Sequence, residues 1–424
     1  MTEALFQFIW QHSLAVSGNL RTMAGESISI ISPGRLNRNA GPDFSEGKIK
    51  IGDTILVGNI ELHIKSSDWI KHGHDSDPAF KNLILHVVYE NDVELPLKHI
   101  PVMELKPHIS NALLHRYEQL MHAPNKIPCS GMLHRVPEIK MESWFERLLA
   151  ERWEEKLREW NVQLDQNAED WRNLLYYRLA YNFGFKTNSA PFLELAKSIP
   201  LTVLGKCRTN LQQVEALLFG QAGFLATNVH DEYSLELRRE YDYLRSKFKL
   251  TPIDRHLWKF LRMRPANFPT VRIAQFAKLI HQSEHLFSTL TEANGIHEMT
   301  PLLDVTASVY WNTHYRLGEI HEKPYPKTLG KDSIHNIIIN TVAPITFLFG
   351  LKTGNDAMRE KAISIMEQIP GEKNSILELW AAENIHANNA GRSQSLIQLY
   401  NNYCTKKNCT QCALGASLIR EQSN

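Results

Sequence analysis

The strongest constraint on the fold is a change of hydrophobic periodicity between residues 125 and 138. Before it, short apolar runs are bounded by Gly, Pro and Asp, which is typical of β-strands and their turns. After it, apolar residues recur at helical spacing and charged residues fill the positions between them. We therefore expect an α/β domain over residues 1–125 and a larger all-α helical domain over residues 138–424.

The α/β domain is expected to begin with a helix over TEALFQFIWQH, with Thr2 as its cap. Strands are predicted for ESISIIS, GKIKI, TILVGNIELHI, LILHVVYE and ELPLKHIPVMELK. Gly52 and Asp53 predict a hairpin between the second and third of these strands. SSDWIKHGH predicts a short helix after the third strand, and HISNALLHRYEQLM predicts the helix that closes the domain.

Composition limits the classes of partner. The formal net charge is +1, and 43% of the 424 residues are hydrophobic, so no global field attracts nucleic acid or a membrane. The first residues lack the basic region and cleavage site of a signal peptide. The longest apolar run, from Ile337 to Phe349, is interrupted by Asn340 and Pro344. We expect a cytoplasmic protein without a membrane partner.

Ionisable residues gather where the second and third strands are predicted. Asp43 follows a proline, and Glu61, His63 and Lys65 alternate along the third strand, so these three are expected on one face. Carboxylates are the ligands that Mg²⁺ or Mn²⁺ prefers. This face is therefore either a metal site or the solvent face of an edge strand.

The order helix, strand, Pro-Asp strand, Glu-x-His strand, helix and apolar strand resembles the PD-(D/E)XK, or restriction-endonuclease-like, nuclease core. That resemblance implies metal-dependent hydrolysis of phosphodiester bonds in DNA or RNA, with Asp43 and Glu61 as metal ligands. His63 stands where the family has a Lys, as base or ligand, and Lys65 is a candidate displaced Lys. Glu3 is a candidate additional ligand from the first helix.

Two other functions remain open. The chain could be a non-catalytic module that binds nucleic acid or protein on a degenerate nuclease scaffold, because His63 lacks the fixed charge of a Lys. It could also be another metalloenzyme centred on His63, His72 and His74. The last two belong to the segment SDWIKHGHDSD, whose acidic residues are Asp68, Asp75 and Asp77; that segment is also compatible with a polar loop at a helix end. His86, in an apolar strand, is expected to be a hydrogen-bonded core histidine.

Three of the five cysteines, Cys404, Cys409 and Cys412, lie within nine residues. An odd number of crowded cysteines does not suggest a disulfide framework. The spacing predicts a zinc knuckle or an iron–sulfur ligand set, for which the fourth ligand would be Cys207, Cys129 or a His. The alternative is that these cysteines act as small buried hydrophobes.

A basic segment, RHLWKFLRMRPANFPTVR, interleaves cations with aromatic residues, as nucleic-acid surfaces do. The alternative is a helix whose Trp258 and Leu261 enter the core, with the arginines on the solvated face. LLFGQAGFL lacks the Gly-Lys-Ser/Thr of a phosphate loop, so its glycines predict close helix packing.

Several blocks taken together carry a wider resemblance. They are NRNAGPDF, GNIELHIKSSDW, HGHDSD, LILHVVY, NLQQVEALLFGQAG, RMRPANFPTVRIAQFA and YCTKKNCTQCALG. With them the chain resembles, over essentially its whole length, the bacterial domain-of-unknown-function family 2851. This resemblance implies no activity of its own, so the nuclease hypothesis depends on the N-terminal residues.

Overall fold

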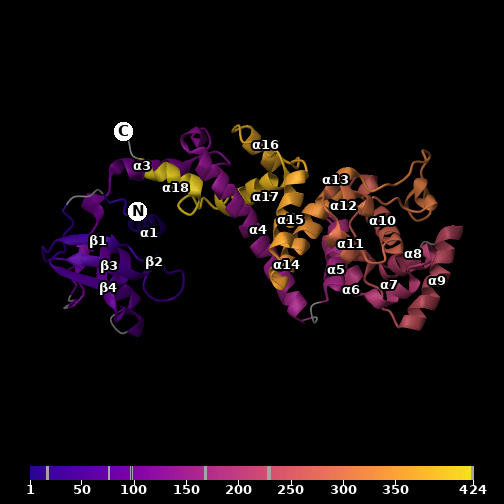
Figure 1. Cartoon of the computed structure of the whole chain (residues 1–424), viewed down its shortest axis with the longest axis horizontal. Helices are drawn as coiled ribbons and strands as arrows, with labels where there is room; N and C mark the ends of the chain where they lie inside the picture. Colours follow the sequence, from indigo (N-terminus) through magenta and orange to yellow (C-terminus); the bar gives the residue numbers. More distant parts are fainter. Residues whose placement is uncertain are drawn as a thin grey trace. The chain divides into compact units, whose positions relative to one another are not determined.

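The computed structural model describes residues 1–15, 19–74, 77–95, 97, 99–166, 170–226 and 231–421, which form two compact units (Figure 1). The sheet unit comprises residues 1–147, 378–385 and 397–424. The helical unit comprises residues 148–377 and 386–396. The sequence analysis assigned everything after residue 138 to the helical domain. The structure instead groups residues 397–424 with residues 1–147, where α18 contacts α3. Local periodicity does not encode this long-range pairing.

The sheet unit is built on a mixed sheet with the strand order β1-β3-β4-β5-β6, and β2 pairs with β3. The strands are β1 (Ile28–Ser32), β2 (Arg35–Leu36), β3 (Phe44–Ile51), β4 (Thr54–Lys65), β5 (Leu83–Glu90) and β6 (Val102–Glu104). Strand β3 pairs antiparallel with β1, β2 and β4, whereas β4–β5 and β5–β6 pair parallel. Ile51 lies opposite Thr54, which confirms the predicted hairpin.

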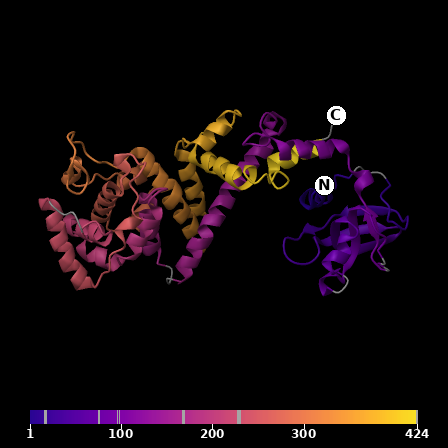
Figure 2. The ribbon, with the colours of Figure 1, turned by 180° about the vertical axis from the view of Figure 1, so that it is seen from behind.

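Helices of the sheet unit cover and connect these strands. In α1 (Glu3–Gln11), the Thr2 side chain accepts a hydrogen bond from the Leu5 N–H, as predicted, and apolar residues of this helix pack against β4. α2 (Asp68–His72) and the 3₁₀ turn η2 (Pro78–Phe80) lie in the crossover between the parallel strands β4 and β5. α3 (Asn111–His122) and α18 (Ala413–Arg420) lie side by side in Figure 1 and from behind in Figure 2.

The helical unit contains most of the remaining helices, and α4, α16 and α17 each cross its boundary. They are α4 (Glu138–Gln166), α5 (Trp171–Phe183), α6 (Ser189–Lys197), α7 (Leu201–Cys207), α8 (Leu211–Gln221), α9 (Glu232–Phe248), α10 (Pro269–Gln282), α11 (Leu286–Glu292), α12 (Ile296–Leu303), α13 (Lys331–Ile337), α14 (Ala343–Thr353), α15 (Asp356–Gln368), α16 (Ser375–Ala381) and α17 (Ala390–Leu399). A short hairpin, β7 (His314–Arg316) with β8 (Glu319–Ile320), departs from the expected all-α architecture.

One long apolar helix contains the run from Ile337 to Phe349 that Asn340 and Pro344 interrupt in the sequence. α13, the π-helical turn η8 (Ile338–Val342) and α14 form a helix from Lys331 to Thr353 that is long and apolar enough to cross a membrane. Two thirds of its most apolar window is buried inside the structure, as in the core helix of a globular unit. Pro344 cannot donate to the carbonyl of Asn340, and the ammonium of Lys156 donates to that oxygen instead, at 3.0 Å.

Close packing of α8 on α9 depends on Gly220, as the glycine-containing segment predicted. A methyl group at this position would lie 2.1 Å from the Tyr241 ring. The Tyr241 hydroxyl donates to Gln221 Oε1 at 2.7 Å, which fixes the ring against the neighbouring turn. The ring therefore has no freedom to yield without breaking a buried hydrogen bond.

We expect Gly220→Ala to lower the free energy of unfolding by about 1–3 kcal/mol, because overpacking a filled helix interface forces the neighbouring groups apart. Gly205→Ala is the matched control, since Gly205 is also helical but has no atom within 4 Å of the added methyl group. Chemical denaturation followed by circular dichroism measures both variants. Equal stability of the two would contradict the packing role of Gly220.

Candidate metal centre

The sheet brings the predicted site residues to one face. Asp43 directly precedes β3, and Glu61 and His63 lie on β4. Phe44 pairs with Ile60, and Glu61 pairs with His86 of the parallel strand β5. Because side chains alternate along each strand, these registers place Asp43, Glu61, His63 and His86 on a common face.

Backbone and side-chain donors fix the two carboxylates beside each other. Asp43 Oδ1 accepts a hydrogen bond from Gln7 Nε2 at 2.8 Å, and Oδ2 accepts one from the Leu62 N–H at 3.0 Å. The Asp43 N–H in turn donates to Glu61 Oε2 at 2.9 Å. One oxygen of Asp43 therefore accepts a hydrogen bond from the backbone of β4, which carries Glu61. One oxygen of Glu61 accepts a hydrogen bond from the backbone of Asp43.

Histidines surround the second oxygen of Glu61. Nε2 of His63 lies 3.6 Å from Glu61 Oε1, and Nε2 of His74 lies 3.5 Å from it. His63 Nδ1 lies 2.9 Å from His86 Nε2, and His63 Nε2 lies 3.1 Å from His72 Nδ1. The His63 ring is thereby held on both nitrogens.

The electrostatics of this cluster lack a fixed positive charge. Burial raises the pKa of Glu61 to about 8, and the Asp43 carboxylate adds to that rise. Burial also raises the pKa of Asp43 to about 6, against the lowering effect of the hydrogen bond from Leu62. Burial, reinforced by the neighbouring histidines, lowers the pKa of His63 to about 3. At neutral pH the imidazole is uncharged and cannot neutralise the carboxylates.

Glu3 increases the negative charge at the same place. Its carboxylate, in the first turn of α1, contributes to the raised pKa of both Asp43 and Glu61. Gln7 follows one turn later on the same helix and binds Asp43. The first helix therefore supplies both an anchor for Asp43 and a third carboxylate near the pair.

Three imidazoles also converge. The ligand atoms of His63, His72 and His74 lie within 4.8 Å of one another, and these are the described residues that form such a group. His63 is buried, His74 is half-buried and His72 is exposed, so the group reaches from the sheet to solvent. Imidazole suits Zn²⁺ and other transition metals, whereas carboxylates suit Mg²⁺ and Mn²⁺. The combined donor set fits Mn²⁺ or Zn²⁺ better than Mg²⁺.

Lys65 is on the predicted face but is not brought to the carboxylates. Four residues of strand separate it from Glu61, which is roughly 13 Å. Its side chain is exposed, and its N–H donates to Asp68 Oδ2 at 3.1 Å. Within the described chain, the ion pairs of Glu61 are with histidines and not with Lys65.

The rest of the segment after β4 has structural roles. Asp68 accepts hydrogen bonds from the Lys71 side chain and from the Lys65 N–H. Asp77 caps η2 through the Ala79 N–H at 2.9 Å. Asp75, named as a candidate from the sequence, lies outside the described residues. Trp69 is buried with its ring 5.0 Å from His86 and 6.3 Å from His63, as judged by ring centroids.

His86 is the site neighbour whose importance the sequence analysis missed. It is fully buried, as expected for a core histidine, but its ring contacts the His63 ring at hydrogen-bonding distance. The signal that identifies it is the parallel register of β4 and β5, which the sequence does not specify.

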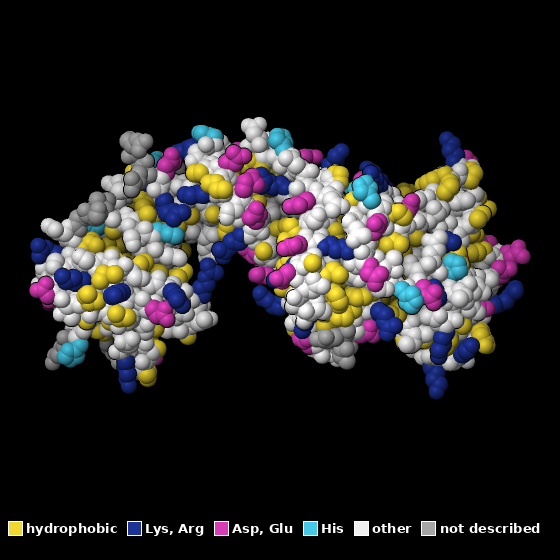
Figure 3. Space-filling view, viewed as in Figure 1, with side chains coloured by type: hydrophobic (Ala, Val, Ile, Leu, Met, Phe, Trp, Pro, Cys, Tyr) yellow, Lys and Arg dark blue, Asp and Glu magenta, His cyan; other side chains and the backbone are white. Residues whose placement is uncertain are grey.

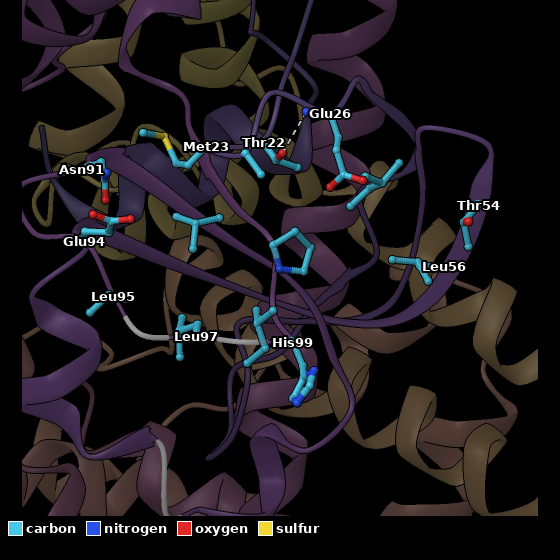
Figure 4. Close-up of a pocket in the computed structure, with 15 residues that line it drawn as sticks. Thr22, Met23, Glu26, Thr54, Leu56, Asn91, Glu94, Leu95, Leu97 and His99 are labelled. Carbon is cyan, nitrogen blue, oxygen red and sulfur yellow. Dashed lines mark hydrogen bonds between the residues drawn. The ribbon is translucent and has the colours of Figure 1, made fainter.

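A separate hollow of 530 Å³ lies elsewhere in the sheet unit (Figure 4). It is lined by the β3–β4 hairpin, by residues 22–26 and by residues that precede β6. Glu26, Glu94 and His99 are its ionisable groups, and the Glu26 N–H donates to Thr22 Oγ1. Asp43, Glu61 and His63 do not line this hollow, so it is not the proposed metal site.

The basic segment of the helical unit is not a continuous helix. Trp258 is buried and its indole N–H donates to the Ala222 carbonyl at 2.9 Å. Arg272 is also buried, over the Phe185 ring. Leu261, expected in the core if this segment were helical, is 83% exposed. Figure 3 shows Lys and Arg interspersed with Asp and Glu on the visible face of this unit. A nucleic-acid surface here stays a prediction.

The C-terminal cysteines all lie in the sheet unit and are buried. Cys129, one of the three candidates for a fourth ligand, is in the same unit, whereas Cys207 belongs to the helical unit. No disulfide joins any of the five cysteines, all of which are described.

Comparisons with known proteins bear on the family and not on the chemistry. No curated protein matches the chain. No solved structure matches it either. A family model described as "Protein of unknown function (DUF2851)" matches residues 3–375, which is most of the sequence. The chain therefore belongs to the DUF2851 family.

Proposed function

We propose that the sheet unit is a metal-dependent phosphodiesterase that hydrolyses DNA or RNA, with Asp43 and Glu61 as metal ligands. The observation that carries this proposal is the pairing of two largely buried carboxylates without a cation. Among the described residues, no Lys or Arg forms an ion pair within 4.0 Å with either group. Ionisation of two adjacent buried carboxylates is unfavourable because the charges repel each other. A divalent cation bound between them would offset that repulsion.

The order of the elements supports a nuclease rather than another hydrolase. Helix α1 is followed by the antiparallel strands β1, β3 and β4, and the crossover through α2 leads to the parallel strand β5. This is the order of the PD-(D/E)XK core that the sequence resembles. In this proposal Asp43 and Glu61 correspond to the metal-binding carboxylates of that core.

Each residue has a defined task in this proposal. A divalent ion at the site supplies Lewis acidity, which lowers the pKa of bound water and polarises a phosphate. Gln7 and the Leu62 N–H orient Asp43, and the Asp43 N–H orients Glu61. Burial lowers the pKa of His63 to about 3, so its imidazole would serve as a neutral metal ligand and not as a base or a fixed positive charge.

A second candidate function is favoured by the imidazole group. His63, His72 and His74 would hold a transition metal, with Glu61 beside it, in a hydrolase of another class. Loss of the exposed His72 separates the candidates: it abolishes metal binding at an imidazole centre, and leaves binding by Asp43 and Glu61 largely intact. The distance of Lys65 from the two carboxylates favours the remaining alternative, a non-catalytic scaffold that binds nucleic acid or protein without cleaving it.

We expect Asp43→Asn and Glu61→Gln each to reduce Mn²⁺- or Mg²⁺-dependent cleavage of labelled single- and double-stranded DNA and RNA on the order of 100-fold or more, because each removes a charge that holds the ion. Glu46→Gln is the control, since Glu46 lies on β3 but pairs with Arg35 at the surface. Cleavage that is equal in all variants, or absent from the wild type with both metals, would overturn the proposal. Binding without cleavage would identify the non-catalytic scaffold.

The metal-free protein is expected to lose stability as pH rises. The folded-state pKa of Glu61, about 8, lies above its ordinary value of 4.5, so the protonated carboxyl stabilises the fold below pH 4.5 and this contribution is lost as pH rises through 8. Glu61→Gln removes this dependence. Denaturation at pH 5 and pH 8.5 measures it, with one sample kept metal-free by a chelator and a second sample, freed of the chelator, supplied with Mn²⁺.

At the higher pH the free energy of unfolding of the wild type should fall relative to that of Glu61→Gln. Mn²⁺ should restore the free energy of unfolding of the wild type only. Parallel pH dependence of the two proteins would show that Glu61 is not the buried, uncompensated group described above.

A further inference from the structure

A second hollow, of 760 Å³, lies within the helical unit. Helices α5, α7 and α10 line it, together with the end of α6 and the segment that leads from α10 into α11. Pockets that bind small molecules commonly measure about 300–1,000 Å³, so this hollow has the size of a ligand site. None of its lining residues belongs to the candidate metal centre.

The wall of the hollow is largely apolar. Its buried apolar side chains are Leu175, Leu179, Leu204, Phe276 and Leu279. Leu286 and Phe287 of α11 are half-buried and extend this wall toward solvent. An apolar ligand that covers these side chains is favoured, because contact removes apolar surface from water.

One buried polar group in this wall lacks a partner. Tyr176 lines the hollow and is 5% exposed, and its hydroxyl has no hydrogen-bond partner among the described residues. The ring stacks on Phe276, with 6.0 Å between the two centroids. Burial raises the pKa of this phenol, so the hydroxyl keeps its proton as a donor. An unpaired buried donor costs stability, and a ligand in the hollow is placed to supply the acceptor.

A cation lies one helical turn from that hydroxyl. Arg172 precedes Tyr176 by four residues on α5, and both side chains line the hollow. Residues at this spacing are neighbours on one helix face. Long side chains lean toward the N-terminus of their helix, so Tyr176 extends toward the turn that carries Arg172. The two side chains thus offer donors to one part of the hollow.

The charges around the hollow favour an anion. Its ionisable lining residues are Asp170, Arg172, Lys197, Arg208, Glu284 and His285. Glu284 pairs with Arg208 at 2.9 Å, and Lys197 pairs with Glu194 at 3.3 Å. Asp170 caps α5 by accepting hydrogen bonds from backbone N–H groups. Among these described residues, the exposed Arg172 guanidinium is therefore the fixed charge that remains for a ligand.

We propose that this hollow binds a carboxylate that carries a long apolar chain, such as a fatty acid. The chain lies along the leucine and phenylalanine wall, and the carboxylate accepts hydrogen bonds from the Tyr176 hydroxyl and the Arg172 guanidinium. Arginine and carboxylate form a charge-assisted hydrogen bond, which is stronger than a neutral one. A cationic head group is repelled by Arg172 and offers Tyr176 no acceptor. The binding of such a ligand is independent of the nuclease proposal, because the two sites share no residue.

Isothermal titration calorimetry of the full-length protein tests the ligand class. Dodecanoate and dodecyltrimethylammonium have chains of equal length and opposite charge, and both are added below the concentrations at which they form micelles. We expect saturable binding of one dodecanoate per chain, and binding of the cation at least about 10-fold weaker. Equal affinity for the two amphiphiles, or no binding of dodecanoate, would overturn the proposal.

Two substitutions test the position of the ligand. Arg172→Gln should weaken dodecanoate binding about 10-fold, because a hydrogen bond to a charged group is lost. Arg238→Gln is the matched control, since Arg238 is exposed on α9 and does not line the hollow. Ile280→Trp enlarges a half-buried wall residue and should abolish binding. If circular dichroism shows that this variant is unfolded, Leu201→Trp replaces it. Unchanged affinity in a folded, filled variant would refute the site.

Tyr176→Phe should have opposite effects on affinity and stability. It removes a donor from the ligand, so dodecanoate should bind more weakly. It also removes an unpaired buried hydroxyl, so the melting temperature of the ligand-free protein should rise. Tyr177→Phe is the control, because Tyr177 is the neighbouring, half-buried tyrosine of the same hollow, and it should change neither quantity. Unchanged affinity in Tyr176→Phe, or a lower melting temperature, would contradict the role given to this hydroxyl.

Discussion

The hydrogen bond from the Asp43 N–H to Glu61 Oε2 is the interaction on which the candidate centre depends. It exists because β3 and β4 pair antiparallel with Phe44 opposite Ile60, which brings the residue before one strand beside the middle of the next. A shift of this register by one residue would turn Glu61 to the other face of the sheet. The hairpin at Gly52 and Asp53 sets the register from Ile51 to Gly47, and an irregularity between Gly47 and Phe44 shifts it by one residue. The turn and this shift together determine where the two carboxylates meet.

The charge distribution around that bond explains why the histidines lie where they do. Burial of Asp43 and Glu61 beside each other is unfavourable unless protons or a cation compensate. The imidazoles of His63 and His86 are themselves kept neutral by burial, so they add donors and acceptors without adding charge. The result is a polar cluster whose members all have ring or carboxylate atoms suited to a metal.

Strand alternation predicted one face for Glu61 and His63, and the resemblance to the nuclease core added Asp43; the structure brings these three side chains close to one another. The same rule put Lys65 on that face but did not account for the length of the strand between them. His72 and His74 were named from their local motif, whereas the contact of His86 with His63 depends on the parallel register of two strands separated by a crossover. Periodicity within one segment carries no information about such a register.

The helices were predicted well where packing follows local sequence, as at Gly220. The helix through Pro344 includes a contact that local sequence does not contain: the Lys156 ammonium donates to the Asn340 carbonyl, to which Pro344 cannot donate. Likewise, the hydrophobic pattern of residues 397–424 indicates helices but not the unit against which they pack.

The assignment of those last residues to the sheet unit has a consequence for biosynthesis. Residues 1–147 emerge from the ribosome first, yet their partners in residues 397–424 are made only after the entire helical unit. A domain normally folds as it is synthesised, but this one must wait, with the surface that receives α18 uncovered, until residues 397–424 have been translated. The helical unit is in effect a long insertion, and the time needed to synthesise it sets the shortest period for which that surface is exposed to other chains and to chaperones.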